Sequence, residues 1–163
     1  QEQREGATLF LEDESRAIGS LSLPLELHIA MSLAPIIRVE EPLEFRVETI
    51  LNDYIVSNLT DFVCLDADKG KGLFAESLLS SLDKIRKRLG GERHSSLRLS
   101  MSAALNNNND LDQHRAWIRG LLVDYYDPMY EYQMTKKQQR VVFKGDSRAF
   151  LNWAAEFADL QEQ

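Results

Sequence analysis

The sequence Pro35-Ile36-Ile37-Arg38-Val39-Glu40-Glu41-Pro42 decides the fold class. Its β-branched residues predict a strand. Pro42 then opens a helix, because proline fits the first helical turn, where no backbone donor is needed. We expect that helix to end near Val56, with an apolar face of Leu43, Val47, Ile50, Leu51 and Tyr54.

A strand and a helix are also predicted upstream. Thr8-Leu9-Phe10-Leu11 is an apolar run that meets Glu12 abruptly, which is typical of a buried strand. Residues 24–31 predict a helix, since Pro24 fits its first turn and Leu27 and Met31 are four residues apart. The order strand, helix, strand, helix indicates an α/β layer architecture.

Residues 57–139 are predicted to be irregular at first and then helical. Residues 57–74 lack periodicity and contain two glycines, so we expect an irregular connection there. Apolar stripes then predict a helix that stops at Gly90 and another that ends in the asparagines of 106–109. Asp110 or Asp112 caps the next helix, and Pro128 is expected to bend or end it, with a further short helix over 129–137.

The C-terminal part predicts a third strand over residues 140–145. Asp146 is expected to cap a final helix that buries Phe150, Trp153, Ala154 and Phe157. Three strands are few for a sheet that is covered on both faces. The opening βα unit of such a sheet is therefore expected outside this sequence.

Composition indicates a globular protein with one sizeable core: 163 residues, 44% hydrophobic and 28% charged. No apolar run is long enough to span a membrane, and the polar first residues do not resemble a leader peptide. The single cysteine, Cys64, predicts no internal disulfide and no metal cluster, and we expect a reducing, cytoplasmic setting.

Charge is distributed unevenly along the chain. The net charge is −7, yet residues 1–76 hold 15 acids against 6 bases, whereas residues 77–163 hold 11 acids against 13 bases. The bases gather in residues 84–88 and again between Lys136 and Arg148. Local patches of this kind bind phosphates even on an acidic protein. The alternative, which charge counting alone favours, is a set of solvated helix faces.

The run from Leu9 to Glu14 has the form of the second nucleotide motif of P-loop proteins, an apolar strand that ends in acids. Asp13 is the candidate magnesium ligand, with Glu12 or Glu14 orienting water or substrate. An ordinary strand end is the alternative. The sequence has no G-x-x-x-x-G-K-[ST] phosphate loop. Arg16 and Arg46 are candidate phosphate contacts at the same edge; their alternative is a surface ion pair.

Four tyrosines, 125, 126, 130 and 132, stand within nine residues. Aromatic platforms beside basic residues stack unpaired RNA bases, and His114, Arg115, Lys136 and Lys137 are candidate phosphate contacts. The alternative is that the tyrosines fasten the helical part to the sheet, which suits Tyr125 because it continues an apolar stripe. The three histidines share no spacing that a zinc ion requires.

These residues resemble the tRNA 2-selenouridine synthases. The specific matches are the Glu-Asp-Glu-Ser-Arg block at 12–16 and the tyrosine block at 125–133. Further matching segments lie at 17–20, 23–24, 39–46, 85–90, 117–122 and 141–146, so the resemblance extends along nearly the whole chain. It is weak from Val56 to Phe74 and in the asparagine loop.

The resemblance implies an enzyme with a cysteine-bearing rhodanese-like domain followed by a P-loop domain. Such an enzyme replaces sulfur by selenium in 2-thiouridine at the tRNA wobble position. It uses selenophosphate and passes through an S-geranyl intermediate, formed from geranyl diphosphate. This sequence resembles only the C-terminal part of the P-loop domain and contains neither the phosphate loop nor the rhodanese cysteine. We therefore expect no catalytic residue within it, and no turnover by this stretch alone.

The fold class implied is a partial P-loop-like α/β fold: a mostly parallel sheet of about three strands, with a helical subdomain inserted before the last strand. The expected divisions are 1–56, an α/β part; 57–74, the irregular connection; 75–138, the helical subdomain; and 139–163, the last strand and helix. The implied partners are tRNA and the missing rhodanese and P-loop segments, and an open sheet edge predicts self-association.

The resemblance also implies site residues. The phosphate- or magnesium-facing set is Glu12, Asp13, Glu14, Arg16 and Arg46. The tRNA-binding set is Arg86, Lys87, Arg88, His114, Arg115, Tyr130, Tyr132, Lys136 and Lys137. Two other classes remain open. One is a stand-alone RNA-binding or adaptor module; the other is a small nucleotide kinase, which the missing phosphate loop opposes.

Overall fold

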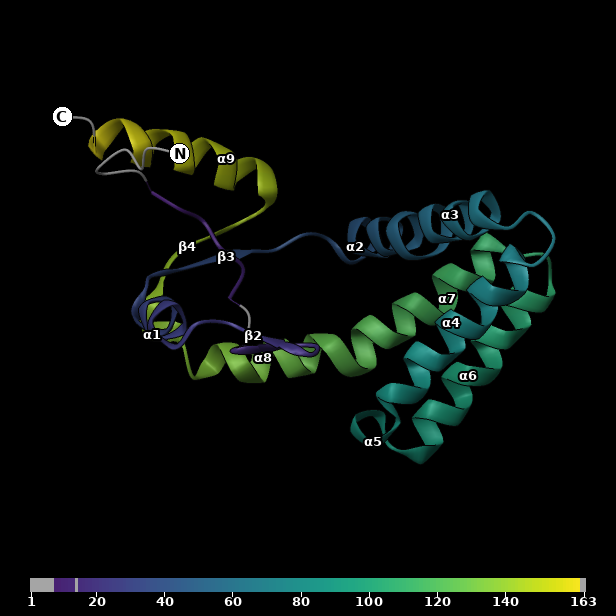
Figure 1. Ribbon diagram of the computed structural model, residues 1–163. Helices are drawn as coiled ribbons and strands as arrows, with labels where there is room; N and C mark the ends of the chain where they lie inside the picture. The colour runs from purple at the N-terminus through teal and green to yellow at the C-terminus, as the bar shows by residue number, and fades with distance from the viewer. Residues whose placement is uncertain (1–7, 14, 162–163) are drawn as a thin grey trace. The chain divides into compact units, whose positions relative to one another are not determined.

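The computed structural model describes residues 8–13 and 15–161, with side chains up to Glu156 (Figure 1). The chain divides into two compact units. The strand unit comprises residues up to Glu41 together with Met134 onward, and the helical unit comprises Pro42–Gln133. None of the described helices has the length and apolar character needed to cross a membrane.

A two-stranded parallel sheet organises the strand unit. β3 (Ile36–Val39) pairs with β4 (Val141–Gly145), with Ile37 opposite Phe143 and Val39 opposite Gly145. Both strands are confirmed, and so is their parallel pairing. Parallel neighbours need a long crossover, and here the helical unit lies between them in sequence. The insertion of helices before the last strand is therefore confirmed as well.

The strand predicted for residues 8–11 is wrong, so the described sheet has two strands and not three. Residues 8–13 have no regular secondary structure, and Leu9 and Leu11 are exposed. A strand needs a neighbour for its backbone groups, and none of the described residues pairs with this segment. A short antiparallel hairpin follows instead, β1 (Ala17–Ile18) with β2 (Leu21–Ser22); Gly19 turns between them at φ 62°.

Two helices accompany the sheet. α1 (Leu25–Leu33) confirms the helix expected after Pro24. α9 (Ser147–Gln161) begins at the expected cap, where Asp146 Oδ1 accepts from the Ala149 amide at 2.7 Å. The Phe150 and Trp153 rings lie 6.2 and 5.3 Å from Phe143 on β4, and Phe10 meets Phe150 edge-on at 5.4 Å. The side chain of Phe157 lies outside the described residues.

The irregular connection expected over residues 57–74 is wrong. α2 (Leu43–Ile50) continues through a π-helical turn, η1 (Leu51–Ser57), into α3 (Asn58–Leu65), and α4 (Gly70–Lys84) follows. Gly70 is a packing residue here, not a loop signal. A Cβ at this position would stand 2.3 Å from the Phe62 carbonyl oxygen, so only glycine allows α3 and α4 to approach this closely.

The next helices begin and end where local signals predict. α5 (Arg86–Leu89) stops at Gly90, whose φ is 84°, and α6 (Gly91–Asn106) runs to the asparagines. Asp110 is the residue that caps α7 (Leu111–Leu121), accepting from the amides of Asp112 and Gln113 at 2.9 and 3.1 Å. The choice left open between Asp110 and Asp112 is thus settled by the two hydrogen bonds that the Asp110 side chain accepts.

Pro128 does not end the helical segment. A second π-helical turn, η2 (Leu122–Tyr126), leads directly into α8 (Asp127–Thr135), and a 3-10 turn, η3 (Gln138–Arg140), precedes β4. A π-helical turn bonds each amide to the carbonyl five residues back, so the ladder is already offset where proline lacks its donor.

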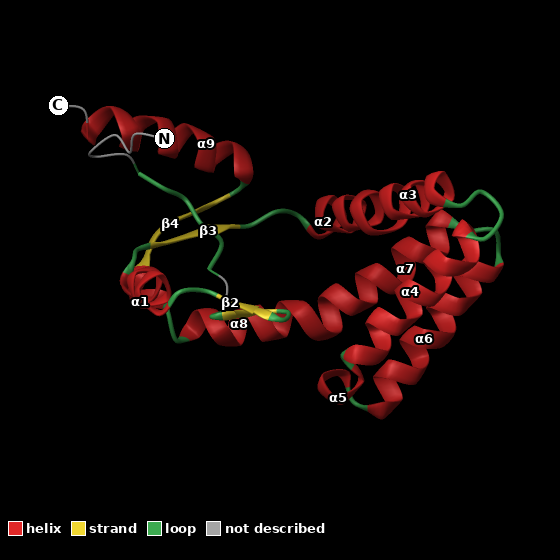
Figure 2. Cartoon of the chain, viewed as in Figure 1, coloured by secondary structure: helices red, strands yellow, loops and turns green. Residues whose placement is uncertain are grey.

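The core lies in the helical unit, which is built of helices throughout (Figure 2). Val47, Leu51 and Ile55 from the first helical segment are almost fully buried, as are Phe74 and Ile118. The stripes predicted around Leu82, Leu97, Met101, Trp117 and Leu122 also face this core. Among the described residues of the strand unit, by contrast, Ile36 is the one large apolar side chain that is buried.

Candidate functional site

One residue of the predicted phosphate- or magnesium-facing set, Asp13, contacts one residue of the predicted tRNA-binding set, Lys137. The Asp13 carboxylate accepts a hydrogen bond and ion pair from Lys137 Nζ. Lys137 lies in the turn before η3 and β4, so Asp13 stands near the beginning of β4 and not at the carboxyl ends of the strands, where it was expected. Glu12 and Arg16 are exposed nearby in sequence, and Glu14 lies outside the described residues.

The magnesium role of Asp13 stays a prediction. Magnesium needs several oxygen ligands, usually with one or two carboxylates. No group of three His, Cys, Asp or Glu side chains within the described residues is placed to share a metal ion. Within the part of the chain that the structure describes, the ammonium group of Lys137 lies beside Asp13.

The carboxyl end of β3 carries different acids, Glu40 and Glu41. The Glu40 amide donates to Gly145 O at 2.8 Å, and Glu41 Oε1 accepts from the Ser147 amide at 2.8 Å at the start of α9. Lys144 approaches Glu40 at 3.3 Å. Glu40 thus extends the pairing of β3 with β4, and Glu41 holds the start of α9. The sequence did not predict this structural role.

Arg46 belongs to the helical unit and pairs with Asp127. Its Nη1 and Nη2 donate to the two carboxylate oxygens at 2.5 and 2.9 Å. The pair lowers the pKa of Asp127, with the hydrogen bond as the largest cause, and raises that of Arg46. The ion-pair alternative therefore describes Arg46 in this structure, with Asp127 as the partner.

Arg115 is also engaged within the protein. It donates to Glu48 from Nε at 2.6 Å and Nη2 at 3.1 Å, and to Asp112 from Nη1 at 2.8 Å. One turn away, Arg119 pairs with Glu44 at 3.0 and 2.5 Å. The two glutamates are four residues apart on α2 and the two arginines four apart on α7, so the pairs form a ladder between the helices.

His114, predicted to contact tRNA, lies in the core instead. It is fully buried, and its Nδ1 accepts a hydrogen bond from Trp117 Nε1 at 2.9 Å. Burial lowers the pKa of His114, so the ring is neutral and acts as the acceptor for the indole. Its position on the α7 stripe with Trp117 and Ile118 was the available signal, because a residue on an apolar stripe faces the core.

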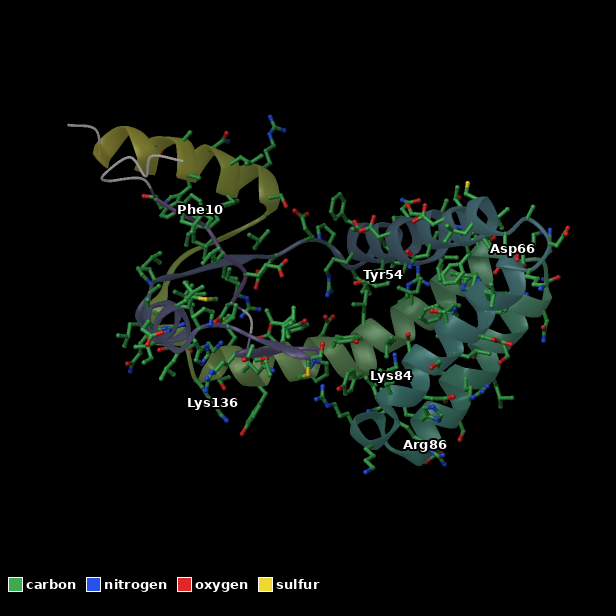
Figure 3. The ribbon with its side chains drawn as sticks, viewed as in Figure 1. Phe10, Tyr54, Asp66, Lys84, Arg86 and Lys136 are labelled. Atoms are coloured by element: carbon green, nitrogen blue, oxygen red, sulfur yellow. The ribbon has the colours of Figure 1, made fainter. Side chains whose placement is uncertain are left out.

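The bases of residues 84–88 are differently placed. Lys84, Arg86, Lys87 and Arg88 are all exposed, and no hydrogen bond or ion pair of their side chains occurs among the described residues. Lys84 and Arg86 mark this segment on α4 and α5 (Figure 3). We call these four residues the basic segment. Unlike Arg46 and Arg115, their charges are available to an external anion.

The tyrosines near the basic segment form a cluster. Tyr126 stacks with Tyr130, with ring centroids 6.2 Å apart and an interplanar angle of 22°, and meets Tyr125 edge-on at 5.0 Å. Tyr125 is half-buried against the core, as its stripe predicts, whereas Tyr130 and Tyr132 are exposed. Burial raises the pKa of Tyr126, and the neighbouring Tyr125, Tyr130 and Tyr54 raise it further while Arg88 lowers it.

Tyr54 was expected on the apolar face of its helix, and that expectation is wrong. Its side chain is 60% exposed, although Leu51 and Ile55 on either side are buried. The three residues lie in the π-helical turn η1, whose wider turn departs from the 3.6-residue period on which the stripe was based. The sequence has no local signal for this turn.

Comparison with known proteins identifies the family. Residues 1–160 match the family model described as the tRNA 2-selenouridine synthase AAA domain. The chain belongs to this family. It is 48% identical over 149 residues to the tRNA 2-selenouridine synthase of Pseudomonas fluorescens. The corresponding figures are 48% over 147 residues for Bordetella petrii and 42% over 153 residues for Marinobacter nauticus.

The alignment with these tRNA 2-selenouridine synthases covers 88–91% of this chain but only 39–42% of the relatives. The chain thus spans about two fifths of the length of the curated relatives it matches. No solved structure matches it. The family resemblance noted from the sequence is confirmed, and the AAA-domain description agrees coarsely with a P-loop-like α/β fold.

Proposed function

We propose that this chain is the tRNA-contacting part of a tRNA 2-selenouridine synthase. In the proposed reaction, sulfur of 2-thiouridine at the wobble position is replaced by selenium from selenophosphate, through an S-geranyl intermediate made from geranyl diphosphate. We assign the chemistry to parts of the enzyme beyond these residues. Within this chain we assign phosphate contacts of the tRNA to the basic segment, Lys84 and Arg86–Arg88.

One observation supports this assignment most directly: the basic segment is exposed and has no acidic partner among the described residues. Four cations within five residues repel one another, which favours a surface that meets polyanions. The protein as a whole is acidic, at −7, so general attraction to nucleic acid is weak and the local patch has to supply the contact.

The strand unit supports the proposal that further polypeptide completes the enzyme. Several of its large apolar side chains are exposed: Leu9 at 76%, Leu33 at 76% and Leu151 at 67%. A protein of this kind buries such residues against another layer. Since the relatives are more than twice as long, we propose that additional strands and helices of the same polypeptide cover this surface.

The proposal predicts that Arg86→Glu with Lys87→Glu weakens tRNA binding by the full-length protein. Each lost phosphate contact should lower the slope of log affinity against log salt by about 1. Affinity is measured by filter binding or fluorescence anisotropy at several salt concentrations. The matched control is Lys69→Glu with Lys71→Glu, which changes the net charge equally at exposed lysines of the same unit.

Loss of affinity together with a lower salt slope in the first variant, and neither change in the control, supports the proposal. An unchanged slope in the first variant contradicts it. Equal weakening in both variants also contradicts it, because the effect would then come from net charge and not from the basic segment.

A further inference from the structure

We propose that Tyr54, Tyr126 and Tyr130, with Arg88, form a stacking site for one unpaired nucleobase of the bound RNA. This inference rests on the proposed function and adds a ligand class to it: a single-stranded nucleotide, whose base stacks on a tyrosine ring while Arg88 contacts its phosphate. Tyr54 is the new member, since neither the tyrosine block nor the basic segment contains it.

The four residues belong to four elements of the helical unit. Tyr54 lies in η1, Tyr126 ends η2, Tyr130 lies one turn later in α8, and Arg88 lies in α5. Tyr130 stacks on Tyr126, with ring centroids 6.2 Å apart. Tyr54 raises the pKa of Tyr126 and Arg88 lowers it, so both act on the Tyr126 hydroxyl through their charges. Tyr126 is thus the centre of the cluster.

Exposure divides the cluster into a support and a receiving surface. Tyr126 is half-buried and packs against the hydrophobic core, so its position is held by the fold. Tyr54 and Tyr130 are 60% and 58% exposed. Exposing the faces of an aromatic ring to water is unfavourable in free energy. A stacked base removes one face from water and leaves the phenol hydroxyl hydrated.

Both π-helical turns lie at this cluster. Tyr54 is exposed within η1, whereas Leu51 and Ile55 of the same turn are buried, and η2 ends at Tyr126 before the regular turn that carries Tyr130. π-helical turns are rare and occur frequently at functional sites. The core does not require Tyr54 to point to solvent, and its place in such a turn supports a functional role for the ring.

The type of ligand follows from the chemistry of the site. Base stacking on tyrosine needs a base that has left the helical stack, and Arg88 adds a cation for the adjacent phosphate. Paired RNA presents its backbone and grooves but no free base face. The site therefore favours a loop or single strand over a duplex, whereas the basic segment alone would bind both.

The experiment measures stacking separately from charge. The probe is a single-stranded uridine heptamer with 2-aminopurine at its centre, whose fluorescence falls when the base stacks. The full-length protein is compared with Tyr54→Ala, Tyr130→Ala and Tyr54→Phe. A blunt RNA duplex of equal length, without an unpaired base, is the second probe. Phe45→Ala is the matched control, because Phe45 is an equally exposed ring on α2, at 56%.

We expect Tyr54→Ala and Tyr130→Ala each to weaken heptamer binding roughly 5- to 150-fold and to abolish most of the quenching. Tyr54→Phe keeps the ring and should bind more tightly than Tyr54→Ala. Duplex affinity and the salt slope should not change, and Phe45→Ala should behave as the unaltered protein. Circular dichroism establishes that each variant is folded.

The inference is overturned if both alanine variants quench and bind the heptamer like the unaltered protein, or if they weaken duplex binding equally. These outcomes leave the proposed function intact as long as Arg86→Glu with Lys87→Glu still lowers the salt slope. If that charge variant has no effect on tRNA while the tyrosine variants do, the assignment of the basic segment fails and the stacking site stands.

Discussion

Arg46 and Asp127 are 81 residues apart in sequence and form a two-point ion pair, with N–O distances of 2.5 and 2.9 Å. The pair fastens α2 to the start of α8, the helix that carries Tyr130. Arg46 was a candidate for phosphate binding, but here its guanidinium has an internal partner. Its role in this chain is to position α8.

The first prediction concerns this pair. In a double-mutant cycle with Arg46→Gln and Asp127→Asn, we expect a coupling free energy of about 1 kcal/mol, reduced by solvent because both side chains are about a third exposed. Urea unfolding provides the measurement. The comparison cycle, Arg98→Gln with Asp83→Asn, probes a single 3.3 Å contact of more exposed side chains and should give a smaller coupling. Equal couplings would contradict the geometric argument.

The second prediction concerns acid stability and His114. Burial holds the pKa of His114 below its ordinary value of 6.5, so the folded state keeps the ring neutral while the unfolded chain takes up a proton as pH falls below 6.5. The free energy of unfolding should therefore decrease from pH 6.5 to 5, by at most about 1.4 kcal/mol per pH unit. His114→Gln keeps an acceptor for Trp117 and should flatten this slope. An unchanged slope in that variant would assign the pH dependence to another group.

The third prediction concerns the ladder between α2 and α7. Arg115→Glu places a carboxylate beside Glu48 and Asp112, so the melting temperature should fall, most of all at low salt. Adding Glu48→Arg restores an opposite-charge pair and should recover part of the loss. Thermal unfolding followed by circular dichroism tests both variants. No recovery in the double variant would show that packing, and not charge, sets the effect.

The fourth prediction concerns the exposed apolar side chains of the strand unit. The polypeptide of residues 1–163 studied alone should self-associate through them, since little else covers them in the described structure. Leu33→Lys with Leu151→Lys should reduce the association, measured by sedimentation velocity. Leu99→Lys is the matched control, because Leu99 is 74% exposed but lies in the helical unit. A monomeric parent polypeptide would refute the prediction.

Local signals in the sequence predicted much of the fold. Strands around Ile36–Val39 and Val141–Gly145, the caps Asp110 and Asp146, and the helix stop at Gly90 all follow from residues within a few positions of one another. The segment 57–74 was the main error. Glycine is typical of loops, so the sequence suggested a loop at Gly70. Only the short distance from a Cβ at this position to the Phe62 carbonyl oxygen shows that Gly70 serves helix packing.

For the candidate site, the sequence located the tyrosine block and the basic segment but not which charges are free. His114 and Arg115 were grouped with the tRNA contacts, yet His114 is buried and accepts a hydrogen bond from Trp117, and Arg115 pairs with Glu48. Tyr54 was placed on the apolar face. Its exposure depends on the π-helical turn η1, which no local pattern predicts.

By itself, then, the sequence determined the α/β pattern, the helical stripes and the family to which this chain belongs. The tertiary structure decided that Asp13 meets Lys137 and that Arg46 meets Asp127, across 124 and 81 residues. The physical reason is the separation along the chain of the residues that interact. Helix and strand periodicity arise from neighbours along the chain, whereas the partner of a charge is set by whichever residues folding brings within a few ångströms.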